Sequence, residues 1–478
     1  MVGCTKETLI SDYARELSRG KATLFIGSGI SRKANYVGWK DILKDVAIEI
    51  GLDVEQEKDL ITLAEYYTRD NQRTKITEAI KDFFADRKGE IQEIHKIIAS
   101  FPIKDIWTTN YDTLLERGFK HANISTTIIT DDDSYKDIDN HAKVKIYKLH
   151  GDYKNASKCI ITRKDYETYN QTHDIVLAEL KGAMCSKSFL FLGYSFSDTD
   201  IQHILSKIRL AYDKAHPQRH FCIVEKVKRE QYKTDDEYNY ANKKQEHRVK
   251  DMQSYGINVL LVDSYNEIED ILIRIRNKVY SKNVLISGAY EDDDDLATNR
   301  IQPVAEKLAN MLIEEGYKIF TGYGKNLGTV IVSGAFVGCT KLGKNVKEFS
   351  DNFVIMPFPY KQNETEQKKK LYTSLRENMI SKTRICIIIA GKKRKNRSII
   401  NSDGVYEEYK IAKESGNLII PVSSTGGVAL TVWDELNQED YYSKQEAFQK
   451  LKTEVSADEI VKLIMQMIKK YREDNYGA

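Results

Sequence analysis

Four short polar clusters in the first half of the chain contain residue types that can bind phosphates or transfer protons. They are Gly27-Ser28-Gly29-Ile30-Ser31, Thr109-Asn110-Tyr111-Asp112, His150-Gly151-Asp152 and Gly193-Tyr194-Ser195. Glycines let a backbone approach a pyrophosphate, and the following amides and serine hydroxyls can donate hydrogen bonds to its oxygens. An imidazole such as that of His150 can take up a proton near neutral pH.

Each cluster also has an ordinary structural explanation. A strand followed by Gly-x-Gly and a helix can be a simple tight turn, and Asn110 or Asp112 could cap a helix that starts near Thr113. A histidine at the end of a strand is usually a structural residue. Because Gly151 follows His150, however, we expect its ring to have little local cover and to point towards a crevice.

The elements that position the clusters are parallel strands separated by helices. Short apolar runs alternate with helical patterns, which is typical of βαβ units. Ligands of such sheets bind at the carboxyl ends of the strands, so the four clusters are predicted to converge on one site. The predicted strands are Ala22–Ile26, Asp105–Thr108, Val144–Leu149, Ser188–Leu192, His220–Glu225 and Ile257–Asp263.

The pattern predicts two domains, residues 1–282 and 283–478, both doubly wound, Rossmann-like α/β folds with mainly parallel sheets. Within the first, the apolar spacing of Trp39–Ile50 predicts one helix, and the polar stretch Lys226–Asp251 is interpreted as a solvated insertion. Predicted strands of the second domain are Val284–Ile286, Lys318–Phe320, Phe353–Met356, Ile385–Ile389 and Leu418–Val422.

The second domain contains a glycine loop, Thr321–Thr329, placed between a strand and a helix as a phosphate or ribose cradle would be. An ordinary glycine-rich turn is the alternative. All nine histidines lie at or before His247, which favours binding over catalysis in this half. Most of the basic run Lys392–Arg397 is interpreted as a solvated face, although one of its lysines could clamp phosphates together with Arg376.

Composition limits the classes of partner and site. Of 478 residues, 41% are hydrophobic and 30% charged, and the formal net charge is only +2, so neither a nucleic acid nor a membrane is expected as a partner. No uncharged apolar run approaches the roughly 20 residues of a membrane helix, and the first twenty residues lack the apolar segment of a signal peptide. The six cysteines form no C-x-x-C pair. We therefore expect a cytoplasmic protein with reduced cysteines and no metal site.

The three motifs Gly-Ser-Gly-Ile-Ser, Thr-Asn-Tyr-Asp and His-Gly resemble, in this order, the glycine-rich, Asn-containing and His-Gly motifs of sirtuins. The resemblance implies NAD as the ligand. It implies that Asn110 positions the ribose hydroxyls or the attacking water, and that His150 acts as general base. It further implies that Asp112 contacts the nicotinamide carboxamide. The remaining implied contacts are the pyrophosphate on Gly27, Ser28, Gly29 and Ser31, and the adenosine ribose beside Gly193 and Ser195.

The chain departs from typical sirtuins in ways that bear on its reaction. It lacks the paired cysteines of their zinc module, and Thr109 stands where they have Gln. Without the module that forms one wall of the acyl-lysine cleft, hydrolysis of NAD is the predicted reaction, with cyclisation as a side reaction. The alternatives are an NAD-dependent protein deacylase or ADP-ribosyltransferase, and a pair of non-catalytic nucleotide sensors.

The second half resembles SLOG domains that sense nucleotide-derived signals, although it lacks the Pro-Gly-Gly-x-Gly-Thr signature of their phosphoribohydrolase relatives. Sirtuin-like and SLOG domains occur together in the NAD-consuming effectors of bacterial Thoeris antiphage defence. This resemblance implies activation by a cyclic ADP-ribose isomer made by a TIR-domain partner, in a homo-oligomer that is a tetramer or larger. The implied signal-binding residues are Ser287, Gly288, Gly322, Gly324, Gly328, Arg376, Lys393 and Glu408, with Glu408 on a ribose hydroxyl.

Overall fold

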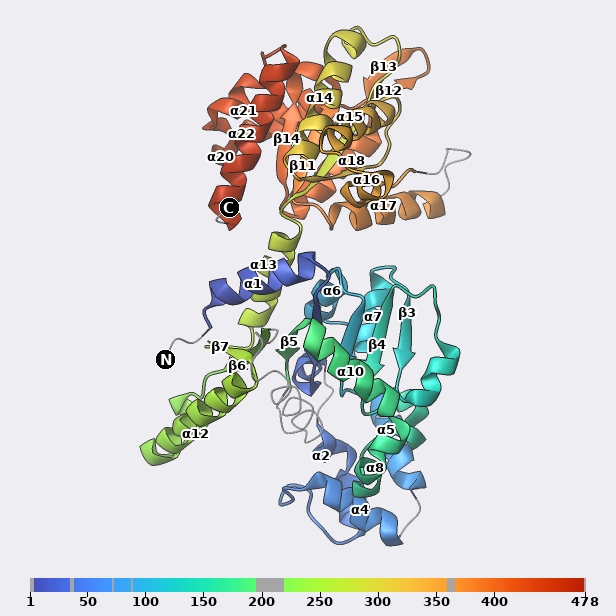
Figure 1. Ribbon diagram of the computed structural model, residues 1–478, viewed down its shortest axis with the longest axis vertical. Helices are drawn as coiled ribbons and strands as arrows, with labels where there is room; N and C mark the ends of the chain where they lie inside the picture. The colour runs from blue at the N-terminus through green and yellow to red at the C-terminus, as the bar shows by residue number, and fades with distance from the viewer. Residues whose placement is uncertain are drawn as a thin grey trace. The chain divides into compact units, whose positions relative to one another are not determined.

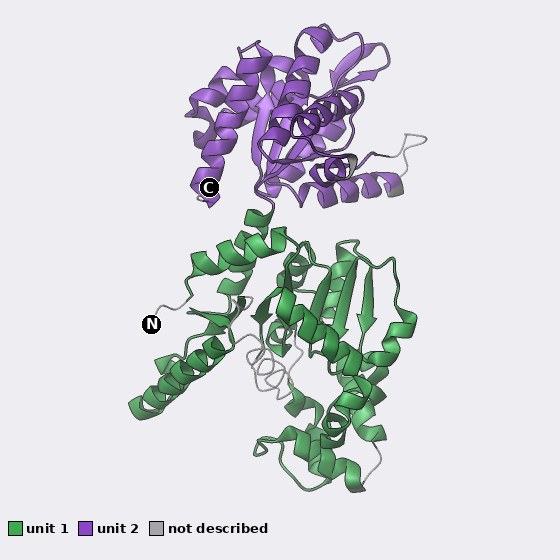
Figure 2. Cartoon of the chain, viewed as in Figure 1, with its two compact units in different colours: residues 1–279 green, residues 280–478 purple. Residues whose placement is uncertain are grey.

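The computed structural model describes residues 4–34, 38–70, 73–86, 89–194, 219–358 and 366–476. The chain divides into two compact units, Met1–Val279 and Tyr280–Ala478 (Figure 2). Each unit contains its own parallel sheet with helices packed against it, so the predicted α/β class is confirmed.

The first unit is built on a seven-stranded sheet with the order β3-β4-β2-β1-β5-β6-β7, in which every pair is parallel. The six predicted strands are present. The additional strand β3 was not predicted, because it is a four-residue edge strand with a weak apolar signal. The strands are β1 (Ala22–Ile26), β2 (Asp105–Thr108), β3 (Thr126–Ile129), β4 (Val144–Lys148), β5 (Ser188–Leu192), β6 (His220–Glu225) and β7 (Ile257–Val262).

Helices cover both faces of this sheet, which explains why β1 and β5 are buried along their whole length. Helices α1, α6, α7 and α13 share one apolar cluster with the sheet, and α10 and α12 share the other. The helices are α1 (Lys6–Ser18), α2 (Trp39–Ile42), α3 (Lys44–Glu49), α4 (Leu60–Asp70), α5 (Thr74–Asp86), α6 (Glu93–Ala99), α7 (Leu114–His121), α8 (Arg163–Glu167), α9 (Tyr169–Thr172), α10 (Asp174–Ser186), α12 (Asp235–Ser254) and α13 (Glu267–Val279).

Helices α2 to α5 form a separate apolar cluster beside the loops that follow β2 and β4 (Figure 1). The single helix predicted over Trp39–Ile50 is wrong, because Leu43, at φ −93° and ψ 2°, divides it into α2 and α3. The apolar positions that suggested it are nevertheless buried in this cluster. The polar stretch before β7 is solvated as expected, but much of it forms the long helix α12, which buries only Val249 and Met252.

The second unit contains a five-stranded parallel sheet with the order β10-β9-β8-β11-β14 and a separate antiparallel hairpin, β12–β13 (Figure 1). The five sheet strands were predicted. The hairpin was not, since its first strand lies in the basic run. The strands are β8 (Asn283–Ala289), β9 (Lys318–Thr321), β10 (Phe353–Ile355), β11 (Ile385–Ala390), β12 (Lys392–Lys395), β13 (Ser398–Asn401) and β14 (Leu418–Val422).

One continuous apolar core joins this sheet to its helices. The chain proceeds outwards from β8 through β9 to β10 and then returns to the other side of β8 with β11. Such a reversal opens a crevice at the carboxyl ends of the two central strands. The helices are α14 (Gln302–Glu314), α15 (Leu327–Lys341), α16 (Val346–Asn352), α17 (Glu366–Ile380), α18 (Asp403–Glu414), α19 (Gly427–Leu436), α20 (Asp440–Ser443), α21 (Glu446–Lys450) and α22 (Ala457–Tyr476).

Candidate active site and ligand cavity

The four predicted clusters of the first unit follow β1, β2, β4 and β5, which are neighbours in the sheet. Because these strands are parallel, their carboxyl ends lie at one edge, and the predicted convergence of the four loops is confirmed. The chain also reverses direction between β1 and β5 here. Ser195 lies outside the described residues.

The glycines of the first and fourth clusters allow the turns after β1 and β5 to touch. The amide of Gly29 donates to the carbonyl of Gly193 at 3.0 Å. A Cβ atom on Gly27 would lie 2.4 Å from the same carbonyl oxygen, so packing alone already requires glycine there. The cluster itself contains a three-residue 3₁₀ turn, Ser28–Ile30, in which Ser28 is exposed, and a second 3₁₀ turn, Arg32–Ala34, follows it.

Asn110 lies in a buried network of polar side chains. Its Nδ2 donates to the carbonyl of Gly27 and to Oγ of Ser31, both at 3.2 Å. Ser31 in turn donates to Oδ2 of Asp112 at 2.7 Å. The other oxygen of Asp112 accepts from the amide of Leu114, the first residue of α7, at 2.9 Å, although the N-cap of that helix is Thr113. Oδ1 of Asn110 is buried without a hydrogen-bond partner among the described residues, which leaves an acceptor for a ligand hydroxyl or a water.

His150 is buried, at 8% exposure. Rings from outside its own turn cover it, one of them from α8 and the other from α2. The ring of Tyr166 meets it edge-on with centroids 5.7 Å apart, and the ring of Trp39 lies 6.5 Å away. Trp39 also stacks on Tyr111 at 6.4 Å, and therefore packs against both the Asn110 loop and the His150 loop.

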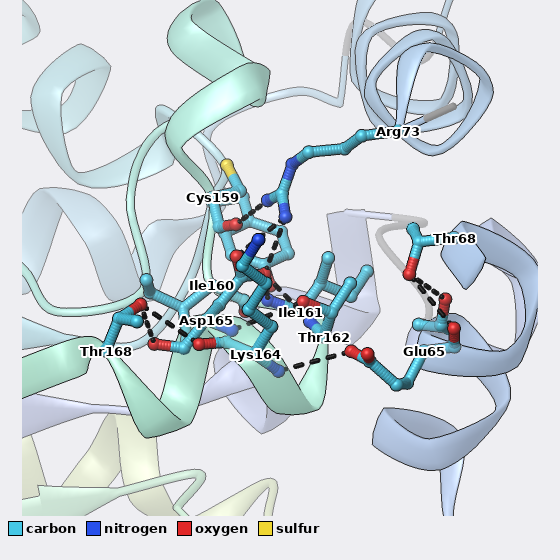
Figure 3. Close-up of polar contacts among 12 residues, drawn as sticks. Glu65, Thr68, Arg73, Cys159, Ile160, Ile161, Thr162, Lys164, Asp165 and Thr168 are labelled. Carbon is cyan, nitrogen blue, oxygen red and sulfur yellow. Dashed lines mark hydrogen bonds and ion pairs between the residues drawn. The ribbon is translucent and has the colours of Figure 1, made fainter. Parts of the chain in front are cut away.

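The segment after His150 is fixed by Arg73, which directly precedes α5 (Figure 3). The Arg73 guanidinium donates to Oδ1 of Asp165 at 2.7 Å and also to the carbonyl of Cys159. Because Tyr166 follows Asp165 on α8, this contact also fixes the ring that covers His150. The sequence did not reveal Arg73, since it lies far from every cluster and in no motif.

Lys148 is a second residue that the sequence did not single out. It ends β4, two residues before His150, and is 1% exposed. Lysines are almost never fully buried unless they are paired. A lysine within a strand gives no sign of its partners, so only the structure identifies it.

The second unit contains a cavity of about 650 Å³ at the reversal between β8 and β11. Seven of the eight predicted signal-binding residues line it, namely Ser287, Gly288, Gly322, Gly324, Arg376, Lys393 and Glu408. Gly328 does not. A Cβ atom there would lie 2.7 Å from the ring of Tyr323, so Gly328 makes room for a lining residue. The lining residues that the sequence did not reveal include Lys325, Phe358, Tyr372, Lys392 and Arg394.

A buried pair of side chains forms one part of the cavity wall. Ser287 donates to Oε2 of Glu408 at 2.5 Å, and Nε of Arg376 lies 3.7 Å from Oε1 of the same carboxylate. Arg376 also contacts Glu407 at 2.9 Å and lies over the ring of Phe358 at 4.6 Å. Burial raises the pKa of Glu408, against the opposing effects of the Ser287 hydrogen bond and the Arg376 charge.

The other basic residues of the cavity are paired with carboxylates. Lys392 lies 2.8 Å from Asp294, and Lys393 pairs with Asp403. The further pairs are Arg394 with Asp293 and Lys325 with Glu291. The interpretation of most of residues 392–397 as a solvated face agrees with the exposure of residues 394–397. Lys392 and Lys393 are only partly exposed, and together with Arg394 they line the cavity.

The described residues contain no cluster of His, Cys, Asp or Glu that could hold a metal ion. Within the same ranges, no helix is both long and apolar enough to span a membrane. All six cysteines are free.

Comparison with known proteins gives matches for both halves. Residues 104–249 match a SIR2-like domain family, and residues 267–471 match the Sir2- and TIR-associating SLOG family. The chain is 35% identical to an NAD(+) hydrolase ThsA of Enterococcus faecium, over 98% of this chain and 100% of that protein. It is 32% identical to the NAD(+) hydrolase ThsA of Bacillus cereus (strain MSX-D12), over 97% of this chain and 98% of that protein. It is also 32% identical to the NAD(+) hydrolase ThsA of Acinetobacter baumannii (strain 532279), over 97% of this chain and 98% of that protein.

Proposed function

Because this chain belongs to the family of the NAD(+) hydrolase ThsA, we propose that its first unit breaks the nicotinamide–ribose bond of NAD. The products are ADP-ribose and nicotinamide. The observation that carries the assignment to a site is the buried network around Asn110, at the edge where four loops converge. Oδ1 of Asn110 has no hydrogen-bond partner among the described residues.

The reaction needs one bond to break, one to form and one proton to move. The bond between C1′ of the ribose and nicotinamide breaks, and its electron pair leaves with the nicotinamide nitrogen. Water forms the new bond to C1′, and His150 takes its proton as general base before releasing it to solvent. Asn110 orients the water or the ribose hydroxyls, and Asp112 contacts the carboxamide.

The proposed binding residues outside the catalytic pair follow the order of the loops. Gly27, Ser28, Gly29 and Ser31 hold the pyrophosphate, while Gly193 and Ser195 lie near the adenosine ribose. The close contact of the turns after β1 and β5 supports this division, because it brings the two turns together at one edge of the sheet.

The second unit senses a cyclic ADP-ribose isomer and thereby activates the first. A cavity of about 650 Å³ suits such a ligand, since small-molecule sites commonly measure about 300–1,000 Å³. Arg376 and Lys393 bind its phosphates and Glu408 binds a ribose hydroxyl. The carboxylates now paired with the cavity cations are exchanged for phosphate oxygens when the ligand binds.

The biological setting follows from the same family. A TIR-domain protein supplies the cyclic nucleotide, the chain assembles into a homo-oligomer in the cytoplasm, and activated hydrolysis depletes NAD in antiphage defence. The match of residues 267–471 to a Sir2- and TIR-associating family supports the TIR partner.

Chromatography of NAD and its products, with and without cyclic ADP-ribose isomers, tests the proposal. We expect Asn110→Ala and His150→Ala each to lower nicotinamide release about 100-fold or more, as loss of a general base or a positioned donor does. His141→Ala replaces an exposed histidine in the same unit and should keep full activity.

Two results would reject this assignment. One is full activity in both site variants, and the other is no nicotinamide release from the parent protein with any isomer. Mass spectrometry that finds ADP-ribose on a protein target, or loss of an acyl group from one, would instead favour the transferase or deacylase alternative.

A further inference from the structure

A single ammonium group joins the loop that carries Asn110 to the loop that carries His150. Nζ of Lys148 lies 3.1 Å from the carbonyl oxygen of Tyr111 and 2.5 Å from that of Asp112. It also lies 2.7 Å from Oδ2 of Asp152, in the loop after β4. Lys148 is thus bonded to both sides of the candidate active site.

On one side, these contacts continue to Asn110 itself. The residue whose carbonyl Lys148 holds, Asp112, accepts the hydroxyl of Ser31, and Ser31 accepts the Asn110 amide. The turn fixed by Lys148 therefore also sets the orientation of the Asn110 side chain.

On the other side, the contact restrains the His150 turn. Asp152 lies two residues after His150, and its bond to Lys148 closes the turn between β4 and the next segment. Oδ1 of Asp152 accepts from the amide of Lys154 at 2.9 Å, which fixes the same carboxylate a second time. The turn that carries the imidazole is held from its far end.

The chemistry of the pocket explains why lysine occupies this position. An ammonium has three donors, and four acceptors surround this one, the fourth being Oε1 of Glu116 at 3.0 Å. Burial by itself lowers the pKa of Lys148, but the charges of Glu116, Asp152 and Asp112 outweigh it and raise the pKa to about 12. The group stays charged at any physiological pH. An apolar side chain of similar volume often stabilises a buried position as well as a charged one. The buried charge of Lys148 therefore indicates that this residue positions the two loops it contacts.

We propose that Lys148 is a positioning residue for NAD hydrolysis, which holds the Asn110 turn and the His150 turn in the geometry that both need at the ribose. This inference rests on the proposed function of the first unit.

The principal test is Lys148→Met in the full chain. We expect kcat for nicotinamide release to fall about 100-fold, because a displacement near 1 Å of catalytic groups costs about that much. KM for NAD should stay within about threefold of the parental value, because the contacts that bind NAD equally in the ground state and the transition state are retained. Lys145→Met, on the opposite face of the same strand, should change neither constant. A folded Lys148→Met protein with parental kcat would overturn the proposal.

A double variant separates positioning from charge balance. Glu116→Gln removes one of the carboxylates left unpaired in Lys148→Met but restores no bond to the carbonyls of the Asn110 loop. We expect Lys148→Met with Glu116→Gln to regain stability and to remain slow. Recovery of parental kcat in the double variant would show that Lys148 only balances charge, and the positioning role would be rejected.

Two further measurements test the proposal if Lys148→Met folds poorly or if no turnover of NAD is detected. If Lys148→Met does not fold, Asp152→Asn weakens one contact only, and we expect kcat to fall about tenfold at unchanged KM. Parental kcat in that variant would again reject the role. Hydrogen exchange of residues 109–114 and 149–153 needs no turnover. Faster exchange of both segments in Lys148→Met but not in Lys145→Met is expected, even if the proposed activity itself proves wrong.

Discussion

The two units hold the polar groups of their candidate sites in opposite ways. In the first unit, Ser31, Asn110 and Asp112 are buried and bonded to one another or to the backbone. In the second unit, cations around an open cavity are paired with carboxylates, some of them as exposed as Asp293 and Asp403, whose side chains are 63% and 86% accessible.

This difference teaches how each site can work. Buried hydrogen bonds are costly to leave unmade, so the first site keeps one geometry, as electrostatic preorganisation for catalysis requires. Exposed ion pairs contribute about 1 kcal/mol or less, so the second site can exchange exposed carboxylates such as Asp293 and Asp403 for ligand phosphates at little cost. This difference fits the roles proposed for the two units, chemistry in the first and reversible binding of an anion in the second.

The largest effect that would sharpen the comparison is a loss of stability at acid pH that only the first unit shows. Burial lowers the pKa of His220 to about 4, and its Nδ1 accepts from the amide of Phe189 at 3.2 Å. As pH falls, His220 is protonated in the unfolded chain at a higher pH than in the folded chain. The contribution of His220 to the free energy of unfolding is therefore fully present above pH 6.5 and is lost towards pH 4, by on the order of 3 kcal/mol. The free energy of unfolding measured against pH should lose this slope in His220→Asn.

A matched variant decides whether that slope belongs to His220. His247→Asn replaces an exposed histidine on α12 and should leave the pH dependence as in the parent. Because the second unit contains no histidine, its own unfolding should not respond to either change. Equal slopes in the parent and in His220→Asn would contradict the prediction.

An intermediate effect is expected at the cavity of the second unit. Arg376→Ala removes the guanidinium that lies beside Glu408 and over Phe358. A hydrogen bond to a charged group contributes about 1.5–3 kcal/mol, so half-maximal activation should need about 10- to 100-fold more cyclic nucleotide. Titration of NAD turnover measures this shift. Arg397→Ala is the control, because it removes an arginine of the same unit that does not line the cavity.

The comparison between the units would fail if Arg376→Ala changed both functions equally. Calorimetry with NAD should give the same affinity in the parent and the variant, because the residue belongs to the second unit. A parallel loss of NAD binding and of activation would mean that the two sites are not separate.

The smallest effect is expected from an exposed carboxylate of the cavity. Asp293→Asn frees Arg394 from its ion pair, and the freed cation should bind the phosphates of the activator more strongly. Since such a pair contributes about 1 kcal/mol or less, affinity should rise about two- to fivefold, and less in high salt. Calorimetry at two salt concentrations checks this. Asp434→Asn, a carboxylate in an exposed pair with Lys452 away from the cavity, should have no effect.

The sequence by itself determined the two α/β units, most of their strands and the four clusters at strand ends. These features depend on local patterns, namely apolar runs of strand length and the polar residues that follow them. Seven of the residues that it assigned to signal binding line one cavity, since the ends of parallel strands meet at one edge whatever the details of packing.

Only the tertiary structure decided which side chains fix those clusters. The contact of Trp39 with His150 joins residues more than 100 positions apart along the chain. Three of the four partners of Lys148 lie 32 to 37 positions away, and the carboxylate paired with Arg394 lies 101 positions away. Contacts between distant segments leave no periodic signal in the sequence. The residues that could do chemistry were therefore readable in advance, while the residues that hold them in place were not.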